Sequence, residues 1–389
     1  MIHFLRTDEG LQQAFWKHGD ALKIEDWLAS QQEMLPVPAA SEWAVPKITS
    51  EGDLADWLGL SIGDLNWLAD LKRLCARNKE QKLQHYHYRV CLKNTGSIRL
   101  IEAPKPRLKA IQRKILAEIL ECIPAHPAAH GFVKARSIKT FAAPHAGRRV
   151  VLRMDLCNFF PSIRGGRVQA LFRTAGYPER IADLLGGICT NAGPRDVWKS
   201  AVGSVDPVAL HELRQLYAWP HLPQGAPTSP ALANLCAYWV DRRLSGLALA
   251  AGAVYTRYAD DLAFSGDEGF ERSVERFATH AAAILLEEGF EVHHRKTRIM
   301  RQGVRQYLAG VVANQHVNVV RADFDRLKAT LTNCVHHGTT SQNRAEHPAF
   351  RQHLAGRIAF VEMINPQKGM RLRRIFERIE CANEENGLC

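Results

Sequence analysis

Two adjacent aspartates, Asp260 and Asp261, interrupt the stretch YTRYADDLAFSG, in which apolar and polar residues alternate on both sides. This alternation predicts a buried β-hairpin with the two carboxylates at its turn. A third aspartate, Asp155, follows the largely apolar run VVLRM, which predicts a buried strand. Carboxylates at the ends of adjacent strands repel one another, and their desolvation is costly unless cations gather there. We therefore expect the three aspartates to hold a pair of Mg²⁺ ions, with Mn²⁺ as a substitute, because both cations bind carboxylate oxygens.

Two such metal ions would clamp the attacking and leaving oxygens of an in-line phosphoryl displacement, which is the chemistry of polymerases. The alternative is an ordinary turn, because Asp-Asp pairs are frequent in hairpin turns. The neighbouring side chains favour the metal site, since Tyr258, Leu262 and Phe264 alternate as one apolar face and would anchor the turn to a core.

Periodicity predicts the elements that must position these aspartates. A strand over 149–163 runs into a turn, and a long helix over 229–252 precedes the hairpin. A second helix over 273–292 and a strand over 305–314 follow it. The order strand, helix, hairpin, helix, strand is typical of an α+β domain and is compatible with a ferredoxin-like sheet. In such a sheet, the strand that ends at Asp155 can lie beside the hairpin.

The segments before this domain change in character along the chain. They read as a helix over 10–34, a linker over 36–46, one or two short helices over 49–74, a β-hairpin over 85–104 and a basic amphipathic helix over 106–124. The tail from about residue 319 is helical and basic. A chain of 389 residues is long for one core and predicts two or three linked subdomains.

The net charge of +11 is unevenly distributed. Residues 1–70 carry 4 Lys and Arg against 12 Asp and Glu, a net charge of −8. Residues 71–114 carry 13 against 2, a net of +11, and residues 291–389 carry 16 against 9, a net of +7. Two basic segments around a nearly neutral centre fit a polyanion that is held from two sides. A solvated basic surface is the alternative.

Composition excludes several classes of protein. Hydrophobic residues make up 46% and charged residues 23% of the chain, as in globular rather than disordered or fibrous proteins. The sequence has no apolar run of the roughly 20 residues that a membrane span needs, and its start does not resemble a signal peptide. The nine cysteines occur without a C-x-x-C pair, which argues against a zinc site and for reduced thiols in the cytoplasm.

Five motifs around the aspartates resemble those of reverse transcriptases. YADD at 258–261 resembles their catalytic box, and MDLCNFFPSI at 154–163 resembles their first palm motif. LPQGAPTSPALANL at 222–235 resembles the motif that opens the helix beneath the template–primer duplex. HHRKTRIM at 293–300 resembles the following lysine motif, and QYLAGVVAN at 306–314 resembles the primer-grip region.

The resemblance covers about residues 85 to 315 and is greatest to bacterial retron-type enzymes, through RLIEAPKPRLKAIQRKIL, AAHGFVKARSI and FAAPHAG. It implies an α+β right-hand polymerase fold with fingers, a ferredoxin-like palm and a helical thumb. The expected boundaries are 1–75 for a helical N-terminal extension, 76–150 for the fingers, 151–315 for the palm with a fingers insertion at about 165–222, and 316–389 for the thumb.

Two departures from the retron pattern leave alternatives open. Retron enzymes usually carry an Asn-Ala-x-x-His signature before the first palm motif, and here Phe141 replaces the Asn while Ala142 and His145 remain. They also tend to carry Val-Thr-Gly after the catalytic hairpin, where this sequence has Leu-Ala-Gly at 308–310. A free-standing defence-type enzyme and a group II intron-like enzyme are the alternatives within the family.

The resemblance implies roles at the active centre. Asp155, Asp260 and Asp261 would be metal ligands, together with Leu156. Lys296 would be the general acid for the pyrophosphate leaving group, or else a phosphate contact.

Five further residues would contact the incoming dNTP. Phe160 matches the aromatic gate that excludes a 2′-hydroxyl, although a lone Phe is usually core. Gln224 and Gly225 would line the nascent base pair, where a small residue lets the backbone approach the nucleotide. Lys93 and Arg99 flank the turn of the fingers hairpin and would hold the triphosphate, with a solvated surface as the alternative.

Other residues would contact the nucleic acid. The resemblance places Lys134 and Arg136 on the template backbone, whereas His145 would contact nucleic acid or be packed in the core. Arginines of the thumb would grip the minor-groove side of the duplex. These thumb residues are Arg371, Arg373 and Arg374.

The function that the resemblance implies is an RNA-directed DNA polymerase that copies a structured non-coding RNA into single-stranded DNA. Priming from an RNA 2′-hydroxyl, a role in anti-phage defence and a neighbouring effector protein are also implied. An inert RNA-binding scaffold is the alternative, and the complete aspartate set opposes it. Since the chain ends at the thumb, we expect no maturase, zinc-bearing endonuclease or ribonuclease H module, so that a host enzyme would remove the RNA. No membrane partner is expected.

The acidic segment 1–70 lies outside the shared motifs and is rich in tryptophan. Two explanations stay open: the tryptophans pack the N-terminal helices onto the fingers, or they form a docking surface for a partner protein or a second copy of the chain. The tryptophans are Trp16, Trp27, Trp43, Trp57 and Trp67.

Overall fold

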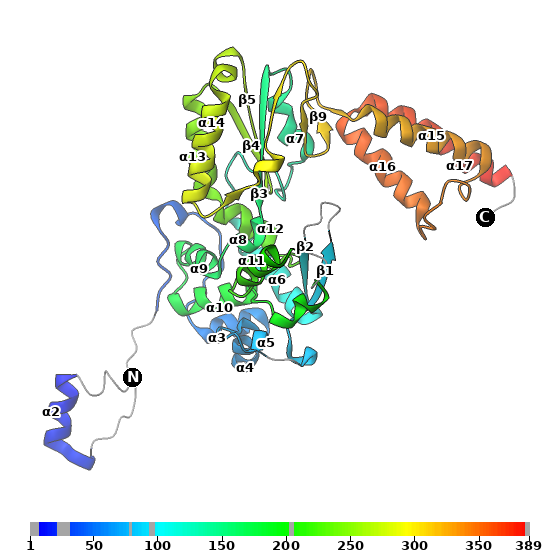
Figure 1. Ribbon diagram of the computed structural model, residues 1–389. Helices are drawn as coiled ribbons and strands as arrows, with labels where there is room; N and C mark the ends of the chain where they lie inside the picture. Colours follow the sequence, from blue (N-terminus) through cyan, green and yellow to red (C-terminus); the bar gives the residue numbers. More distant parts are fainter. Residues whose placement is uncertain (1–7, 22–31, 78–79, 93–97, 202–205, 386–389) are drawn as a thin grey trace.

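The computed structural model describes residues 8–21, 32–77, 80–92, 98–201 and 206–385. Figure 1 shows a sheet with helices packed against it at the top of the molecule and a mostly helical body beneath it. The C-terminal helices extend to one side of the sheet, and a short N-terminal helix lies apart from the body. Within the described ranges, no helix is long and apolar enough to cross a membrane.

A five-stranded antiparallel sheet carries the aspartates. Strand β3 (Val150–Cys157) pairs with β5 (Asp261–Gly266), and β5 pairs in turn with β4 (Val254–Tyr258). On its other side β3 pairs with two short strands, β6 (Glu291–Val292) and β7 (Arg298–Arg301). The predicted hairpin and the predicted strand beside it are both confirmed.

Alternate side chains of the sheet enter two different cores, as the twofold period of a strand requires. Leu152 and Phe264 face helices α13 (Tyr238–Ala250) and α14 (Glu268–Glu287), which cover one side of the sheet. Val151 and Ala263 face the other side, where they join a second core with α7 (Ile138–Ala142) and the C-terminal helices. Both faces of β3 and β5 are therefore buried, which explains their nearly continuous apolar sequences.

The prediction of one strand over 305–314 is wrong. The segment forms two short antiparallel strands, β8 (Tyr307–Leu308) and β9 (Val311–Val312), and β10 (Asn318–Val319) extends this second sheet. Ala309 and Gly310 make the turn, with φ of 42° and 96°. Two-residue hairpin turns of type I′ require a positive φ at both central residues. In the Leu-Ala-Gly departure from the family pattern, Leu308 therefore ends β8, and Ala309 and Gly310 form the turn.

The body beneath the sheet contains a β-hairpin and several helices. β1 (Tyr86–Leu92) pairs with β2 (Ile98–Pro104) along their whole length, as the sequence predicts. Helix α12 begins at Ser229 with Pro230 in its first turn, where proline is tolerated because that N–H has no intrahelical partner. The helices are α6 (Pro106–Glu118), α8 (Phe159–Ser162), α9 (Gly165–Thr174), α10 (Glu179–Cys189), α11 (Pro207–Tyr217) and α12 (Ser229–Cys236).

The N-terminal region consists of short helices, most of them packed on the body. Helix α2 (Glu9–His18) has no buried residue and leaves Trp16 87% exposed. Trp43 and Trp57 pack against the main core, and the Trp57 indole donates to Glu118 at 2.9 Å. Of these tryptophans, Trp43 and Trp57 therefore pack against the body, whereas Trp16 is exposed. The other helices are α3 (Glu51–Leu58), α4 (Ile62–Ala69) and α5 (Leu74–Arg77).

Part of the predicted helix over 10–34 lies outside the described residues, as does Trp27. The described part ends with a single 3₁₀ turn, Gly19–Ala21. The remaining 3₁₀ turns are Pro38–Ala40, Gln81–Leu83, Leu120–Cys122, Ala143–His145, Arg195–Ala201 and His294–Lys296.

The C-terminal region is a bundle of helices, as the sequence predicts. α15 (Arg321–His337), α16 (Phe350–Ile364) and α17 (Pro366–Glu385) pack on one another through buried apolar side chains. Leu331 and Leu354 are among the buried residues of this core, which is continuous with the core on the outer face of the sheet. The bundle is thus attached to the palm sheet through a shared core.

Candidate active site

The sheet brings the three aspartates together at one end of β3 and β5. Asp155 and Asp261 are direct partners in the strand register, and Asp260 lies in the turn that precedes β5. The backbone N–H of Leu156 donates to the carbonyl of Asp260 at 3.0 Å, which ties the turn to β3. The convergence predicted from sequence is therefore present.

Burial makes this cluster electrostatically unfavourable. The pKa of Asp260 is raised, first by burial and then by the charge of Asp155. The pKa of Asp261 is raised to about 6, mainly by burial, although Arg153 opposes the shift. Buried carboxylates that repel one another are stabilised by cations. The cluster therefore favours the approach of positive charge.

Two basic side chains supply part of that charge. The Lys296 ammonium lies 2.7 Å from Oδ2 of Asp155, and the Arg153 guanidinium lies 2.6 Å from Oδ1 of Asp261. Lys296 was expected near the site from its motif. Arg153 was missed, although it stands two residues before Asp155 and so projects from the same face of the strand.

The donor set fits a hard divalent cation. Three carboxylates on neighbouring strands offer only oxygen ligands, which Mg²⁺ and Mn²⁺ prefer. In the described part of the chain, no group of three or more His, Cys, Asp or Glu side chains is placed so that it could hold a metal ion. Asp155 and Asp261 are instead hydrogen-bonded to Lys296 and Arg153. These ion pairs must rearrange before the carboxylates can share a cation, and the role of Leu156 stays a prediction.

A buried arginine holds the turn before Asp260. Ala259 has a left-handed backbone with φ of 55°, which is uncommon for a residue with a Cβ. The guanidinium of Arg257 donates to its carbonyl at 3.1 Å and to both carboxylate oxygens of Asp241, at 2.7 and 2.6 Å. Arg257 and Asp241 are fully buried. We missed this clamp because Arg257 alone, between Thr256 and Tyr258, carries no signal of its buried partners.

A loop closes over the same turn. A Cβ on Gly131 would lie only 2.7 Å from the backbone nitrogen of Ala259, so the close approach requires glycine. The Gly131 carbonyl accepts from Asn234 at 2.7 Å. Arg136 donates to the carbonyl of Ala129 in this loop at 2.7 Å. Its guanidinium thus braces the loop next to the active centre.

The family assignment follows from similarity over this same region. The model of the family "Reverse transcriptase (RNA-dependent DNA polymerase)" matches residues 91–318, which include all three aspartates. The chain is 40% identical over 344 residues to the retron Mx65 reverse transcriptase of Myxococcus xanthus, covering 88% of this chain and 75% of that protein. The chain belongs to the retron-type reverse transcriptases. It is an RNA-directed DNA polymerase with the α+β right-hand polymerase fold of the family.

Two further similarities accompany this assignment. The retron Mx162 reverse transcriptase of Myxococcus xanthus is 37% identical over 360 residues, which are 89% of this chain and 70% of that protein. A solved structure of the foamy viral protease-reverse transcriptase in complex with double-stranded DNA has a TM-score of 0.36 and 15% identity. That similarity covers 78% of this chain and less than half, 44%, of the viral protein.

The expected sugar gate of the reverse transcriptase, Phe160, belongs to an aromatic group that reaches Tyr258, two residues before Asp260. Phe160 is half-buried, and its ring centroid is 6.3 Å from that of Phe132, which is in turn 6.3 Å from that of Tyr258. Phe132 is exposed and has a left-handed φ of 59°. Phe132 therefore connects Phe160 to Tyr258, and it is a member of this aromatic group that the motifs did not reveal.

The expected nucleotide-lining loop packs on the fingers hairpin. The backbone N–H of Glu102 donates to the carbonyl of Gln224 at 2.9 Å. Gly225 has φ of 132°, and a Cβ there would lie 2.9 Å from the Glu102 carbonyl. Contact with β2 thus requires this glycine. The buried Glu102 carboxylate meets His221 at 2.9 Å and Asn191 at 2.8 Å, so the hairpin and the loop form one unit.

Of the two predicted triphosphate ligands, Arg99 and Lys93, the structure describes only Arg99. Arg99 is exposed on β2, and its charge opposes the upward pKa shift that burial causes at Asp260. Lys93 lies outside the described residues. Lys134, predicted on the template backbone, is exposed and forms an ion pair with Glu121 at 2.6 Å.

The prediction that His145 contacts nucleic acid is wrong. His145 is fully buried, and its ring nitrogens lie 2.7 Å from the Ser265 hydroxyl and 2.8 Å from the Thr256 hydroxyl. Thr256 donates its proton to the Phe141 carbonyl, so it accepts from the imidazole. Burial lowers the pKa of His145 to about 3, and the ring is neutral. The residue joins the sheet to α7.

The three thumb arginines have different surroundings. Arg371 and Arg374 are exposed on α17. Arg373 makes two hydrogen bonds to the carboxylate of Glu362 on α16, at 3.0 and 2.6 Å. A bidentate pair of this kind holds two helices together. Arg373 is therefore already bound within the bundle, whereas the other two present their charges to the surface.

Proposed function

We propose that this reverse transcriptase copies a structured non-coding RNA into single-stranded DNA by two-metal phosphoryl transfer, in anti-phage defence. The observation that supports the mechanism is the convergence of Asp155, Asp260 and Asp261 at one end of the sheet, with raised pKa values at the latter two. The similarity to retron enzymes of Myxococcus xanthus supports the choice of RNA.

Asp155, Asp260 and Asp261 would hold two Mg²⁺ ions, or Mn²⁺ in their place. When bound, such ions neutralise the charge that develops on the attacking and leaving oxygens. The carboxylates themselves must be ionised for this role, and the buried Asp261, with a pKa of about 6, is ionised at neutral pH. Lys296 and Arg153 would neutralise the cluster between turnovers.

Lys296 is the proposed proton donor to the leaving pyrophosphate. Its ammonium lies 2.7 Å from Asp155, so it is already within the active centre. From this position the ammonium could give a proton to an oxygen of the leaving pyrophosphate. Contact with the leaving phosphate without proton transfer is the alternative role, and a solvent isotope effect on Lys296→Arg would separate the two.

The dNTP is proposed to bind between the fingers hairpin and the catalytic turn. Arg99 is exposed on β2, and its charge lowers the pKa of Asp260 against the effect of burial, while Lys93 follows the end of β1 in sequence. Phe160 would lie under the sugar and exclude a 2′-hydroxyl, while the backbone at Gln224 and Gly225 would contact the nascent pair. The contact of this loop with β2 supports the proposal, because one rigid unit would then hold both ends of the nucleotide.

Sequencing the nucleic acid that copurifies with the enzyme tests the proposed function. We expect a DNA strand complementary to part of one structured RNA, present with wild-type enzyme and absent with Asp260→Ala. Phage plating on cells with either protein tests the defence role. Recovery of random cellular RNA without complementary DNA would contradict the proposal.

A further inference from the structure

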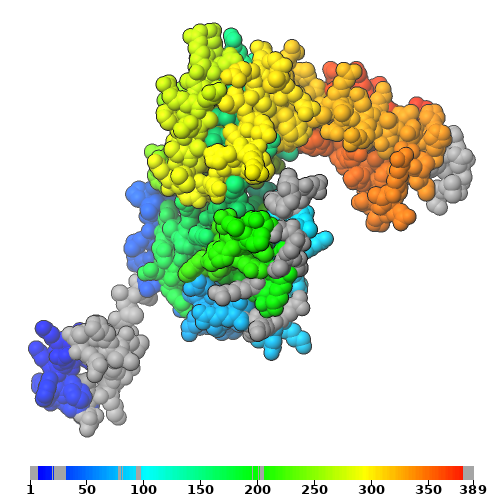
Figure 2. All heavy atoms as spheres, viewed as in Figure 1, coloured from blue at the N-terminus to red at the C-terminus, as the bar shows by residue number. Residues whose placement is uncertain are grey.

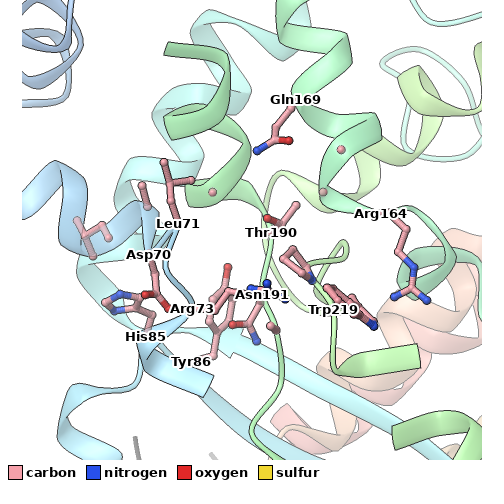
Figure 3. Close-up of a pocket in the computed structure, with 17 residues that line it drawn as sticks. Asp70, Leu71, Arg73, His85, Tyr86, Arg164, Gln169, Thr190, Asn191 and Trp219 are labelled. Carbon is pink, nitrogen blue, oxygen red and sulfur yellow. The ribbon is translucent and has the colours of Figure 1, made fainter. Parts of the chain in front are cut away.

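A cavity of about 510 Å³ adjoins the network that holds the loop of Gln224 and Gly225, because Asn191 in its lining donates to Glu102, whose backbone N–H donates to the Gln224 carbonyl. Its volume is in the range of roughly 300–1,000 Å³ that holds small molecules or single nucleotides. Figure 3 shows its lining side chains, which come from the turn between α4 and α5, the start of β1, the start of α9, the end of α10 and the segment before α12.

An exposed tryptophan and two arginines form the rim of the cavity. Trp219 is 55% exposed, and the Arg73 guanidinium lies 4.9 Å from its ring centroid. Arg73 has a left-handed φ of 57°, so the chain adopts an uncommon conformation at this residue. Arg164 lies on the other side of Trp219 in Figure 3 and is held by a 2.5 Å hydrogen bond to the Leu216 carbonyl.

The floor of the cavity is polar and rigid. Tyr86, Thr190 and Asn191 are buried there, and Asn191 donates to Glu102 at 2.8 Å and to the Tyr88 hydroxyl at 3.0 Å. Because the backbone N–H of Glu102 also donates to the loop carbonyl of Gln224, this network connects the cavity to the proposed nucleotide-lining loop. A ligand in the cavity would therefore contact the same network that holds this loop.

The positive charges of Arg73 and Arg164 at the rim favour an anionic ligand. The carboxylate of Asp70 also lines the cavity, but it accepts from the backbone N–H groups of Leu74 and Cys75 at 2.7 and 3.0 Å and so caps α5. Among the described residues, neither the indole N–H of Trp219 nor the amide of Gln169 has a hydrogen-bond partner. The basic segment 71–114, with a net charge of +11, begins at this rim.

We propose that the cavity binds one unpaired nucleotide of the RNA template, ahead of the nascent base pair. The base would stack on Trp219, since every base has a face that an indole can cover. Arg73 and Arg164 would hold the flanking phosphates, and Gln169 and Asn191 would meet the base edge. The inference rests on the RNA template of the proposed function but is independent of its two-metal mechanism.

Paired RNA duplexes with and without an unpaired 5′ template extension provide the test. Wild-type enzyme should bind the extended duplex more tightly than the blunt one. Trp219→Ala should reduce that advantage roughly 5- to 150-fold, which is the effect of losing one stacked base. Arg73→Ala should also reduce it, and Trp219→Phe should restore most of it, because a phenyl ring still stacks.

Trp239 is the matched control. It is 59% exposed and has Arg242 at 5.0 Å from its ring centroid, as Trp219 has Arg73, but it does not line the cavity. Trp239→Ala should leave the advantage of the extended duplex unchanged. An equal loss in both alanine variants, or no loss in Trp219→Ala and Arg73→Ala, would overturn the proposal.

Free AMP distinguishes a strand site from a site for free nucleotides. Millimolar AMP should leave the binding of the extended duplex unchanged if the flanking phosphates of the strand are recognised. Competition by AMP that Trp219→Ala abolishes would overturn the template assignment in favour of a free nucleotide. All of these experiments measure RNA binding and none measures polymerase activity. Their outcome therefore does not depend on whether Asp260→Ala retains that activity, so the template site and the two-metal mechanism can be refuted separately.

Discussion

At the residue scale, the buried carboxyl of Asp261 makes the stability of the fold depend on pH. Its pKa of about 6 is above the value of about 3.9 for Asp in an unfolded chain. Because the folded-state pKa is the higher one, the carboxyl contributes stability below pH 4 that is lost as the pH rises through 6. At neutral pH, ionisation of this group costs the metal-free fold about 3 kcal/mol.

Asp261→Asn should therefore stabilise the metal-free enzyme at pH 7, by up to about 3 kcal/mol, and have little effect at pH 4. Urea unfolding in EDTA at both pH values measures this. Asp267→Asn is the control, since Asp267 is an exposed carboxylate paired with Arg148. A stabilisation that is equal at the two pH values would contradict the electrostatic explanation.

The proposed role of Phe160 as a sugar gate makes a second prediction at this scale. Phe160→Ala should raise kcat/KM for ribonucleotides relative to deoxyribonucleotides, because it opens the space that a 2′-hydroxyl would occupy. Phe132→Ala removes the neighbouring ring and leaves Phe160, so it should change the ratio much less. If Phe160→Ala leaves the ratio as it is in the wild type, Phe160 is only a core residue.

The sequence was sufficient to predict the positions of residues that belong to local motifs. Asp155, Asp260 and Asp261 could be found because alternating apolar residues locate them at strand ends. Arg153 could have been found from its place two residues before Asp155, which puts it on the same face of the strand. Arg257 could not, because nothing near it in the sequence indicates its buried partner Asp241. His145 was misassigned for the same reason: its partners, Thr256 and Ser265, are more than 100 residues away and make it a core residue.

At the element scale, the hairpin turn depends on the ion pair beneath it. Arg257→Met should destabilise the fold by roughly 3–5 kcal/mol, because it leaves the buried Asp241 charge without a partner. The double variant Arg257→Met with Asp241→Leu should recover much of that stability. It should not recover activity, since Ala259 still lacks the guanidinium that holds its carbonyl.

Thermal unfolding and primer extension on the same preparations separate these effects. Arg243→Met is the control, because Arg243 pairs with Glu287 and Glu288 at the surface and such pairs contribute about 0–1 kcal/mol. Full activity in the double variant would show that Arg257 acts only on stability and does not position the turn.

Elements with a clear period were predictable, whereas tight turns were not. The β4–β5 hairpin and α14 follow from periods of two and of about 3.6. The strand over 305–314 was misjudged because apolar residues flank Ala309 and Gly310 on both sides, and their positive φ angles are invisible in an apolar pattern. The Leu-Ala-Gly departure thus marks a turn.

At the scale of the whole molecule, the charge map predicts how RNA binding depends on salt. Affinity for a structured RNA should fall by about 0.7–0.9 log units per log unit of salt for each phosphate contact. In the double variant Arg371→Ala with Arg374→Ala, the slope of log affinity against log salt concentration should be smaller by the amount that roughly one to two phosphate contacts contribute. Arg373→Ala should instead lower the melting temperature, because Arg373 is bound to Glu362.

Filter binding over a series of salt concentrations gives these slopes. A slope that is the same in wild type and in the double variant would show that the thumb arginines do not contact phosphates. The separation of Arg373 from its neighbours could not be predicted from RLRR, since the sequence does not reveal which arginine faces α16.

The central claim is that three converging carboxylates catalyse DNA synthesis on RNA. The most direct test is primer extension and RNA filter binding by Asp260→Ala with Asp261→Ala, with Asp267→Ala as the control at a surface carboxylate. We predict that the double variant loses Mg²⁺-dependent incorporation while its RNA affinity stays close to that of the wild type. Incorporation at the wild-type rate by the double variant would contradict the account.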